Sequence, residues 1–177
     1  MRALALVLAF ALAPAYAQLR PPDVRYEPSL PPIVEAMLQL GDVRAGDLVY
    51  DLGCGDGRVV IAAARERGAR GVCVDIDPQR IAEARQNAGL AGVSERIRFV
   101  NADLFQTDFS DATVVMLFLW PDLNVKLRPK LLQLKAGTRI VSHEHLMGDW
   151  EPERTVHVRT GGRMHPVYRW TVPARGP

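Results

Sequence analysis

The sequence predicts an α/β fold: a doubly wound, mostly parallel sheet of seven strands that ends in an antiparallel hairpin. Short apolar segments alternate with segments of helical periodicity as far as residue 142. Two segments of alternating polarity, 155–159 and 167–172, then follow with no helix between them, as in a hairpin at a sheet edge. The chain has 177 residues, 48% of them hydrophobic, which suits one domain, placed here at residues 30–177.

The elements follow in order along the chain. Residues 18–29 contain several prolines and predict an extended lead-in. Pro31 and Pro32 fit the first turn of a helix that stops near Gly41. The remaining predicted strands span 48–51, 71–75, 97–100, 113–119 and 138–142, and the remaining helices span 59–67, 78–91 and 123–134, the last broken or kinked by Pro129.

The first 17 residues predict a secretory signal peptide. A basic Met1-Arg2 precedes an apolar run, residues 3–13, that is shorter than the roughly 20 residues needed to cross a bilayer. Small residues surround a cleavage site after Ala17. A buried N-terminal helix and an uncleaved anchor are the competing interpretations. We expect a periplasmic or secreted protein that starts at Gln18 and has no stable association with the membrane after cleavage.

The chain has two cysteines, Cys54 and Cys73. Export makes a disulfide conceivable. However, Cys54 lies in a glycine-rich loop and Cys73 in a predicted buried strand, so that a bond between them would have to distort the loop. We therefore expect no structural disulfide.

A glycine-rich loop, Asp51-Leu52-Gly53-Cys54-Gly55-Asp56-Gly57, follows the first predicted sheet strand, where doubly wound sheets bind ligands. Its glycines follow G-x-G-x-G and not the dinucleotide fingerprint G-x-G-x-x-G, whose last glycine is Arg58 here. The loop carboxylates would repel a pyrophosphate, since two charges about 5 Å apart interact by roughly 3 kcal/mol at an effective dielectric near 20. They suit the sulfonium and ammonium groups of S-adenosylmethionine.

Carboxylates also stand at the ends of three successive predicted strands. Asp51 ends the first, Asp75 ends the second and can accept both hydroxyls of a ribose, and Asp103 follows the third, where it can accept the adenine amine. One such residue alone would be interpreted as a loop or cap residue, but three at one sheet edge indicate a site. The expected cofactor-binding residues are Asp51, Gly53, Cys54, Gly55, Asp75, Ile76, Asp103 and Leu104.

The loop, together with V-C-V-D at 72–75 and N-A-D-L-F at 101–105, resembles the motifs of class I S-adenosylmethionine-dependent methyltransferases. Residues 26–170 resemble more closely the small archaeal broad-specificity protein lysine methyltransferases and, more distantly, the lysine methyltransferases of the ATP synthase c-subunit. The segments that carry this likeness are 26–29, 51–58, 112–115, 128–131, 137–139, 141–144 and Trp150. The resemblance implies a Rossmann-like methyltransferase fold and a protein lysine as methyl acceptor.

The resemblance also implies which residues handle the acceptor. Tyr26 and Ser29 should fold over the methyl donor, Trp120 should wall the acceptor channel, and Glu144 and Trp150 should form its mouth. The alternatives are that the two tryptophans pack in the core and that Glu144 is a loop carboxylate whose hydrogen bonds are satisfied within the loop. Methyl transfer depends on alignment and on exclusion of water, so no catalytic acid or base is assigned.

The net charge of +2 predicts no nucleic-acid partner. His143, Glu144, His145, His157 and His165 match no strong metal motif, so no metal is expected. Two other functions stay open: methylation of a small molecule or another side chain, and non-catalytic binding of S-adenosylmethionine. The oligomeric state is not predicted.

Overall fold

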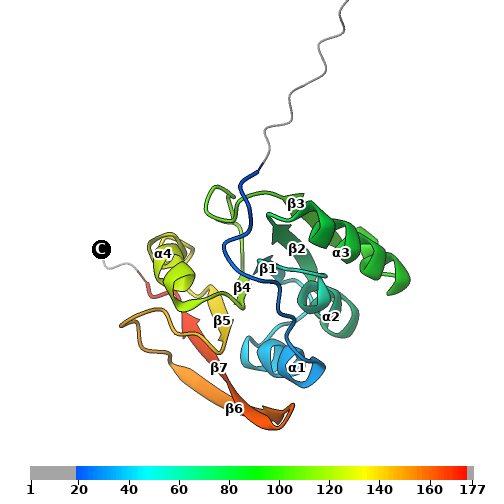
Figure 1. Ribbon diagram of the computed structural model, residues 1–177. Helices are drawn as coiled ribbons and strands as arrows, with labels where there is room; N and C mark the ends of the chain where they lie inside the picture. The colour runs from blue at the N-terminus through cyan, green and yellow to red at the C-terminus, as the bar shows by residue number, and fades with distance from the viewer. Residues whose placement is uncertain (1–18, 175–177) are drawn as a thin grey trace, which may run out of the picture.

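The computed structural model describes residues 19–174 and shows one seven-stranded sheet with helices on both faces (Figure 1). The strand order is β3-β2-β1-β4-β5-β7-β6; the first five strands are parallel, and β7 runs antiparallel to both of its neighbours, β5 and β6. The strands are β1 (Leu48–Leu52), β2 (Arg70–Asp75), β3 (Ile97–Asn101), β4 (Val114–Leu117), β5 (Arg139–His143), β6 (Arg154–Thr160) and β7 (Arg163–Thr171). The predicted fold class is confirmed.

The helices are α1 (Pro31–Leu40), α2 (Arg58–Arg67), α3 (Pro78–Leu90) and α4 (Pro121–Leu131), with a 3-10 turn at Ser94–Arg96. Helix α4 differs most from its predicted span of 123–134. It begins two residues earlier, at Pro121, which fits the first turn because its missing N–H has no intrahelical partner there. It contains Pro129 in its last turn and ends at Leu131.

The sheet buries both of its faces. In β1, Tyr50 and Leu52 pack with α4, whereas Val49 packs with α1 and α2, as the two-residue period of a strand requires. Helix α3 packs beside α2 on the same face as α1. Burial on both faces explains why β4 is an unbroken apolar run.

The lead-in crosses the carboxyl edge of the parallel strands before it enters α1 (Figure 1). Hydrogen bonds help to hold it there: Arg20 Nε donates to Asp103 Oδ2 at 2.9 Å, and Arg58 Nη1 donates to the backbone oxygen of Ser29 at 2.9 Å. The first 29 residues therefore include a segment, 19–29, that belongs to the site. The predicted signal peptide and its cleavage site lie outside the described residues. Within residues 19–174, no helix is both long and apolar enough to cross a membrane.

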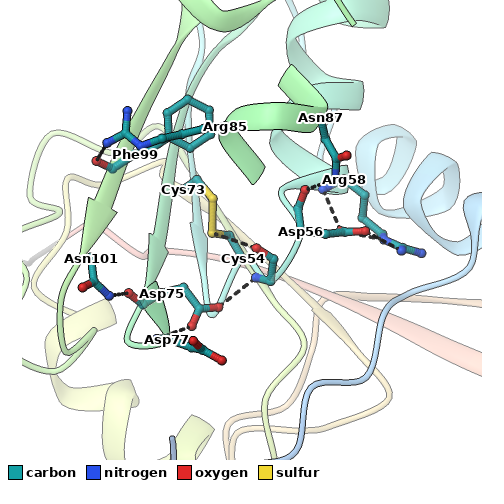
Figure 2. The surroundings of a disulfide bond; sticks show 11 residues. Cys54, Asp56, Arg58, Cys73, Asp75, Asp77, Arg85, Asn87, Phe99 and Asn101 are labelled. Atoms are coloured by element: carbon teal, nitrogen blue, oxygen red, sulfur yellow. Dashed lines mark hydrogen bonds and ion pairs between the residues drawn. A yellow bond between two sulfur atoms is a disulfide. The ribbon is translucent and has the colours of Figure 1, made fainter. Parts of the chain in front are cut away.

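Cys54 and Cys73 form a disulfide, so the expectation that they stay apart was wrong (Figure 2). The reason lies in the pairing of β1 with β2. Asp51 is in register with Cys73, and the N–H groups of Gly53 and Cys54 both donate to the Val74 oxygen, at 2.8 and 3.0 Å. The loop thus folds back over β2, and the disulfide joins the two without disturbing the glycine turn.

Candidate functional site

A pocket opens at the carboxyl ends of β1, β2 and β4, below the lead-in. Its mouth is open to solvent, and the cavity behind the mouth has a volume of about 140 Å³. The walls come from residues 20–29 of the lead-in, the glycine-rich loop, the turns after β2 and β3, and residues 118–123.

The glycine-rich loop can form only with glycine at its turning points. Gly53, Gly55 and Gly57 have φ values of 84°, 54° and 80°, in the left-handed region that favours glycine. A Cβ on Gly55 would stand 2.4 Å from Cε2 of Tyr26, and one on Gly53 would stand 2.9 Å from Cδ2 of Leu119. The absence of side chains therefore lets the lead-in and the segment after β4 close on the loop.

Asp75 joins the loop to the end of β2. Its Oδ2 accepts from the Gly55 N–H at 2.8 Å, and its Oδ1 accepts from the Asp77 N–H at 2.9 Å (Figure 2). The Asn101 amide secures the same turn by donating to the backbone oxygens of Asp75 and Ile76, both at 3.0 Å. Each carboxylate oxygen keeps a second lone pair, which fits the predicted role of accepting ribose hydroxyls.

Asp51 lies buried at the base of the pocket. Burial, and after it the charges of Asp75 and Asp56, raise the pKa of its carboxyl to about 8. A carboxyl in this position gains from a cation beside it, because the cation favours its ionised form. The ammonium or sulfonium of S-adenosylmethionine would supply such a charge, so the pocket fits the cofactor predicted from the sequence.

Asp103 reaches the pocket already paired. Its Oδ2 accepts from Arg20 at 2.9 Å and its Oδ1 from the Phe105 N–H at 2.9 Å. The hydrogen bond from Arg20 lowers the pKa of the Asp103 carboxyl. Arg20, which sequence reasoning did not single out, therefore helps to hold the lead-in across the pocket.

The predicted acceptor residues divide into two groups. Tyr26, Ser29 and Trp120 line the pocket together. The Tyr26 ring covers Gly55 and has the Arg80 guanidinium 4.6 Å from its centroid. Trp120 is 62% exposed, which leaves its indole free at the mouth.

The structure does not bring Glu144 and Trp150 to the pocket lining. Trp150 packs beside Trp170, with ring centroids 6.0 Å apart, and its backbone oxygen accepts from Trp170 Nε1 at 2.7 Å. Glu144 faces β7, where its Oε1 lies 2.9 Å from Arg163 Nη2 and 3.0 Å from His165 Nδ1. Both residues therefore support the antiparallel part of the sheet, where β5 pairs with β7.

Phe118 and His145 complete the acceptor wall, and sequence reasoning did not assign them to it. Both line the pocket, and their rings stack with centroids 6.1 Å apart and an interplanar angle of 15°. Burial lowers the pKa of His145, so its imidazole is neutral at pH 7. Their positions just after β4 and β5 are the available sequence signal, since the carboxyl ends of parallel strands carry the ligand site.

The lining carries more carboxylates than cationic groups. The acidic residues are Asp23, Glu27, Asp51, Asp56, Asp75, Asp77 and Asp103, and the basic ones are Arg20, Arg25, Arg58 and Arg80. Arg20 and Arg58 are themselves paired with carboxylates of this set. The pocket therefore favours cationic ligands.

Comparisons with known proteins agree with this site. Residues 51–154 match the family model of the ANTKMT methyltransferase domain. A protein-lysine N-methyltransferase of Saccharolobus islandicus (strain REY15A) is 42% identical over 153 residues, covering 85% of this chain and 95% of that protein. The lysine N-methyltransferase of the ATP synthase c-subunit from Mus musculus is 33% identical over 143 residues, which cover 80% of this chain and 56% of that relative.

A similar solved structure contains S-adenosyl-L-homocysteine, the demethylated product of the cofactor. The structure, described as an RNA methyltransferase from Salinibacter ruber in complex with S-adenosyl-L-homocysteine, is 51% identical. It superposes with a TM-score of 0.79 over 85% of this chain and 97% of that one. The chain thus belongs to the class I S-adenosylmethionine-dependent methyltransferases, in the family of the ANTKMT methyltransferase domain, and its cofactor is S-adenosylmethionine.

Proposed function

We propose that the chain methylates lysine ε-amines of proteins. The observation that carries the proposal is the acid-rich pocket with an exposed aromatic side chain, Trp120, at its mouth. A lysine side chain is a cation on an apolar stem, so carboxylates attract its head and an indole face can contact both parts. The relatives named as lysine methyltransferases support the same acceptor.

The residues of the chain account for the steps that such a transfer needs. The bound cofactor supplies an electrophilic methyl group on a sulfonium. Tyr26 and Ser29 hold the lead-in over the pocket, while Phe118 and Trp120 form the wall along which the lysine enters. The lysine must lose a proton before it attacks. His145, neutral and on the same wall, can accept a hydrogen bond from the neutral amine.

RNA is the second candidate acceptor, because the 51% identical structure from Salinibacter ruber is described as an RNA methyltransferase. Binding of RNA depends on cationic groups that neutralise phosphates. The excess of carboxylates in the pocket would repel the phosphate backbone of RNA. We therefore rank protein above RNA.

One experiment separates these acceptors. The purified chain is incubated with methyl-labelled S-adenosylmethionine and either a bacterial protein extract freed of nucleic acid or total RNA freed of protein. We expect label in the protein sample, on lysine by mass spectrometry. Label in the RNA alone, or on other side chains, would contradict the proposal. Cofactor binding by calorimetry with no transfer to either sample would favour a binding protein without activity.

We also propose that the chain is exported, with cleavage after Ala17, leaving the lead-in and one domain. The layout of residues 1–17 supports this, and so does the Cys54–Cys73 disulfide, since disulfides persist mainly in oxidising compartments. Expression in a Gram-negative host should yield periplasmic protein whose N-terminal sequence starts at Gln18. An Ala17→Phe variant should stay uncleaved, and full-length wild-type protein in the cytoplasm would contradict export.

A further inference from the structure

Three side chains next to the pocket converge on a small volume that the methyltransferase chemistry does not use. His143 Nε2 lies 3.2 Å from His165 Nδ1, and Glu144 Oε1 lies 3.0 Å from the same Nδ1. The ligand atoms of the three residues all lie within 4.8 Å of one another. His143 and His165 are only 2% and 4% exposed, so solvent does not separate them.

Within this cluster of His143, Glu144 and His165, there are fewer N–H donors than there are acceptors facing them. The Ser29 Oγ lies 3.0 Å from His143 Nδ1. If that nitrogen donates to Ser29, His143 Nε2 is left with a lone pair that points at His165. One N–H on His165 Nδ1 must then serve both this lone pair and the Glu144 carboxylate. The single N–H of His165 therefore faces two acceptors, His143 Nε2 and Glu144 Oε1. A metal ion at this position would be bound by both of these atoms and by His165 Nδ1.

We propose that His143, Glu144 and His165 bind one Zn²⁺ ion. Zinc takes imidazole nitrogens and carboxylate oxygens at about 2.0–2.2 Å in tetrahedral geometry, which places ligand atoms roughly 3.3 Å apart. The two distances of 3.2 and 3.0 Å are close to this spacing. His143 would bind through Nε2 and His165 through Nδ1, with the His165 proton moved to Nε2. A water molecule would fill the fourth position.

The surroundings fit this assignment. The Ser29 hydroxyl can accept from His143 Nδ1 when Nε2 binds the metal, which is the usual role of a second partner on a metal-binding histidine. Arg163 pairs with Glu144 at 2.9 Å, but its side chain is 57% exposed and can turn to solvent.

The position of the site indicates a structural role. His143 ends β5, Glu144 begins the following turn with a φ of 63°, and His165 lies in β7. None of the three lines the pocket, but Ser29 does, and it belongs to the lead-in. Bound zinc would therefore fasten the antiparallel edge of the sheet to the segment that covers the cofactor. This inference does not depend on the acceptor proposed above.

The test is titration of the full chain, free of any histidine tag and stripped with a chelator, with Zn²⁺ alone. We expect one ion per chain by calorimetry and a higher melting temperature with zinc. Co²⁺ in its place should give the visible absorption of a tetrahedral site. Absence of stoichiometric binding to the wild-type chain would overturn the proposal.

Variants assign the ligands. His165→Ala should abolish binding and Glu144→Gln should weaken it at least tenfold. Ser29→Ala, which removes only the partner of His143, should weaken it by about 10–100-fold. His157→Ala is the matched control, because His157 is exposed on β6 and should leave affinity unchanged. If His165→Ala does not fold, the other two variants decide, and unchanged affinity in both of them would contradict the assignment.

Discussion

The carboxylate of Asp75 accepts a hydrogen bond from the backbone N–H of Gly55 at 2.8 Å, and this contact ties the end of β2 to the loop that follows β1. The two residues are 20 positions apart in sequence. One side chain therefore shapes the glycine turn and offers its remaining lone pairs to the cofactor. Loss of the carboxylate should affect both.

Replacement of Asp75 by alanine should weaken binding of S-adenosylmethionine by roughly 1.5–3 kcal/mol, the range for hydrogen bonds that involve a charged group. Calorimetry measures the change, and circular dichroism should show an intact fold. Glu95→Gln is the control, because Glu95 is exposed before β3, at the opposite edge of the sheet. An affinity equal to that of the wild type would show that Asp75 only caps its turn.

The disulfide should stabilise the chain and the loop together. It closes a separation of 19 residues, for which the loss of chain entropy in the unfolded state is worth about 3 kcal/mol. Reduction should lower the melting temperature by roughly 6–12 °C for a domain of this size. The double variant Cys54→Ser/Cys73→Ser should melt at the lower temperature with or without reductant. If the melting temperature of the wild-type chain were the same with and without reductant, the prediction would be contradicted.

Asp51 should make the free protein less stable as the pH rises. Its pKa of about 8 in the folded chain exceeds the ordinary value of 3.8, so the folded state holds the proton more tightly. The contribution to stability is therefore present below pH 4 and lost as the pH rises to 8, by up to about 5 kcal/mol. Asp51→Asn keeps the neutral shape and should melt higher than the wild type at pH 8.

The same substitution should weaken cofactor binding, because the cation loses its carboxylate. At pH 7 the wild-type chain should release a proton when it binds S-adenosylmethionine, and the variant should release less. Calorimetry in buffers of different ionisation enthalpy measures this proton. Equal pH profiles of melting for wild type and Asp51→Asn would show that the pKa is not raised.

The sequence predicted the fold well because its signals are local. Periodicity located the strands to within a few residues. Helix α3 begins at Pro78 as predicted, and the Asp77 side chain before it accepts from the Gln79 N–H at 2.8 Å. The glycine spacing located the pocket, because the loop follows β1 directly. The hairpin strands were predicted too short, since exposed positions next to the hairpin turn, such as Arg163, carry no alternating signal.

The rest depended on contacts between distant segments. The disulfide was missed because the register of Asp51 with Cys73 cannot be inferred from either segment alone. Trp150 was predicted to lie at the channel mouth, but its ring meets Trp170, which arrives from β7. The His143, Glu144 and His165 cluster has no motif in sequence, because 22 residues separate its two histidines.

Trp120 should act on the acceptor and not on the cofactor. Trp120→Ala should raise the KM for a protein acceptor about tenfold, the loss of roughly 1–2 kcal/mol of aromatic contact with a cation. The affinity for S-adenosylmethionine should change little. Leu90→Ala is the control, because Leu90 is 82% exposed at the end of α3 and lies outside this pocket. A loss of cofactor affinity equal to the rise in KM would place Trp120 on the donor side.

The pH dependence of methyl transfer should report the protonation of the acceptor. A lysine amine attacks only when neutral, and its ordinary pKa is about 10.4. The rate at subsaturating acceptor should therefore climb about tenfold per unit between pH 7 and pH 9. A flat profile for the wild type, measured with saturating S-adenosylmethionine, would exclude an unperturbed lysine as the acceptor and point to a nucleophile that carries no proton at pH 7.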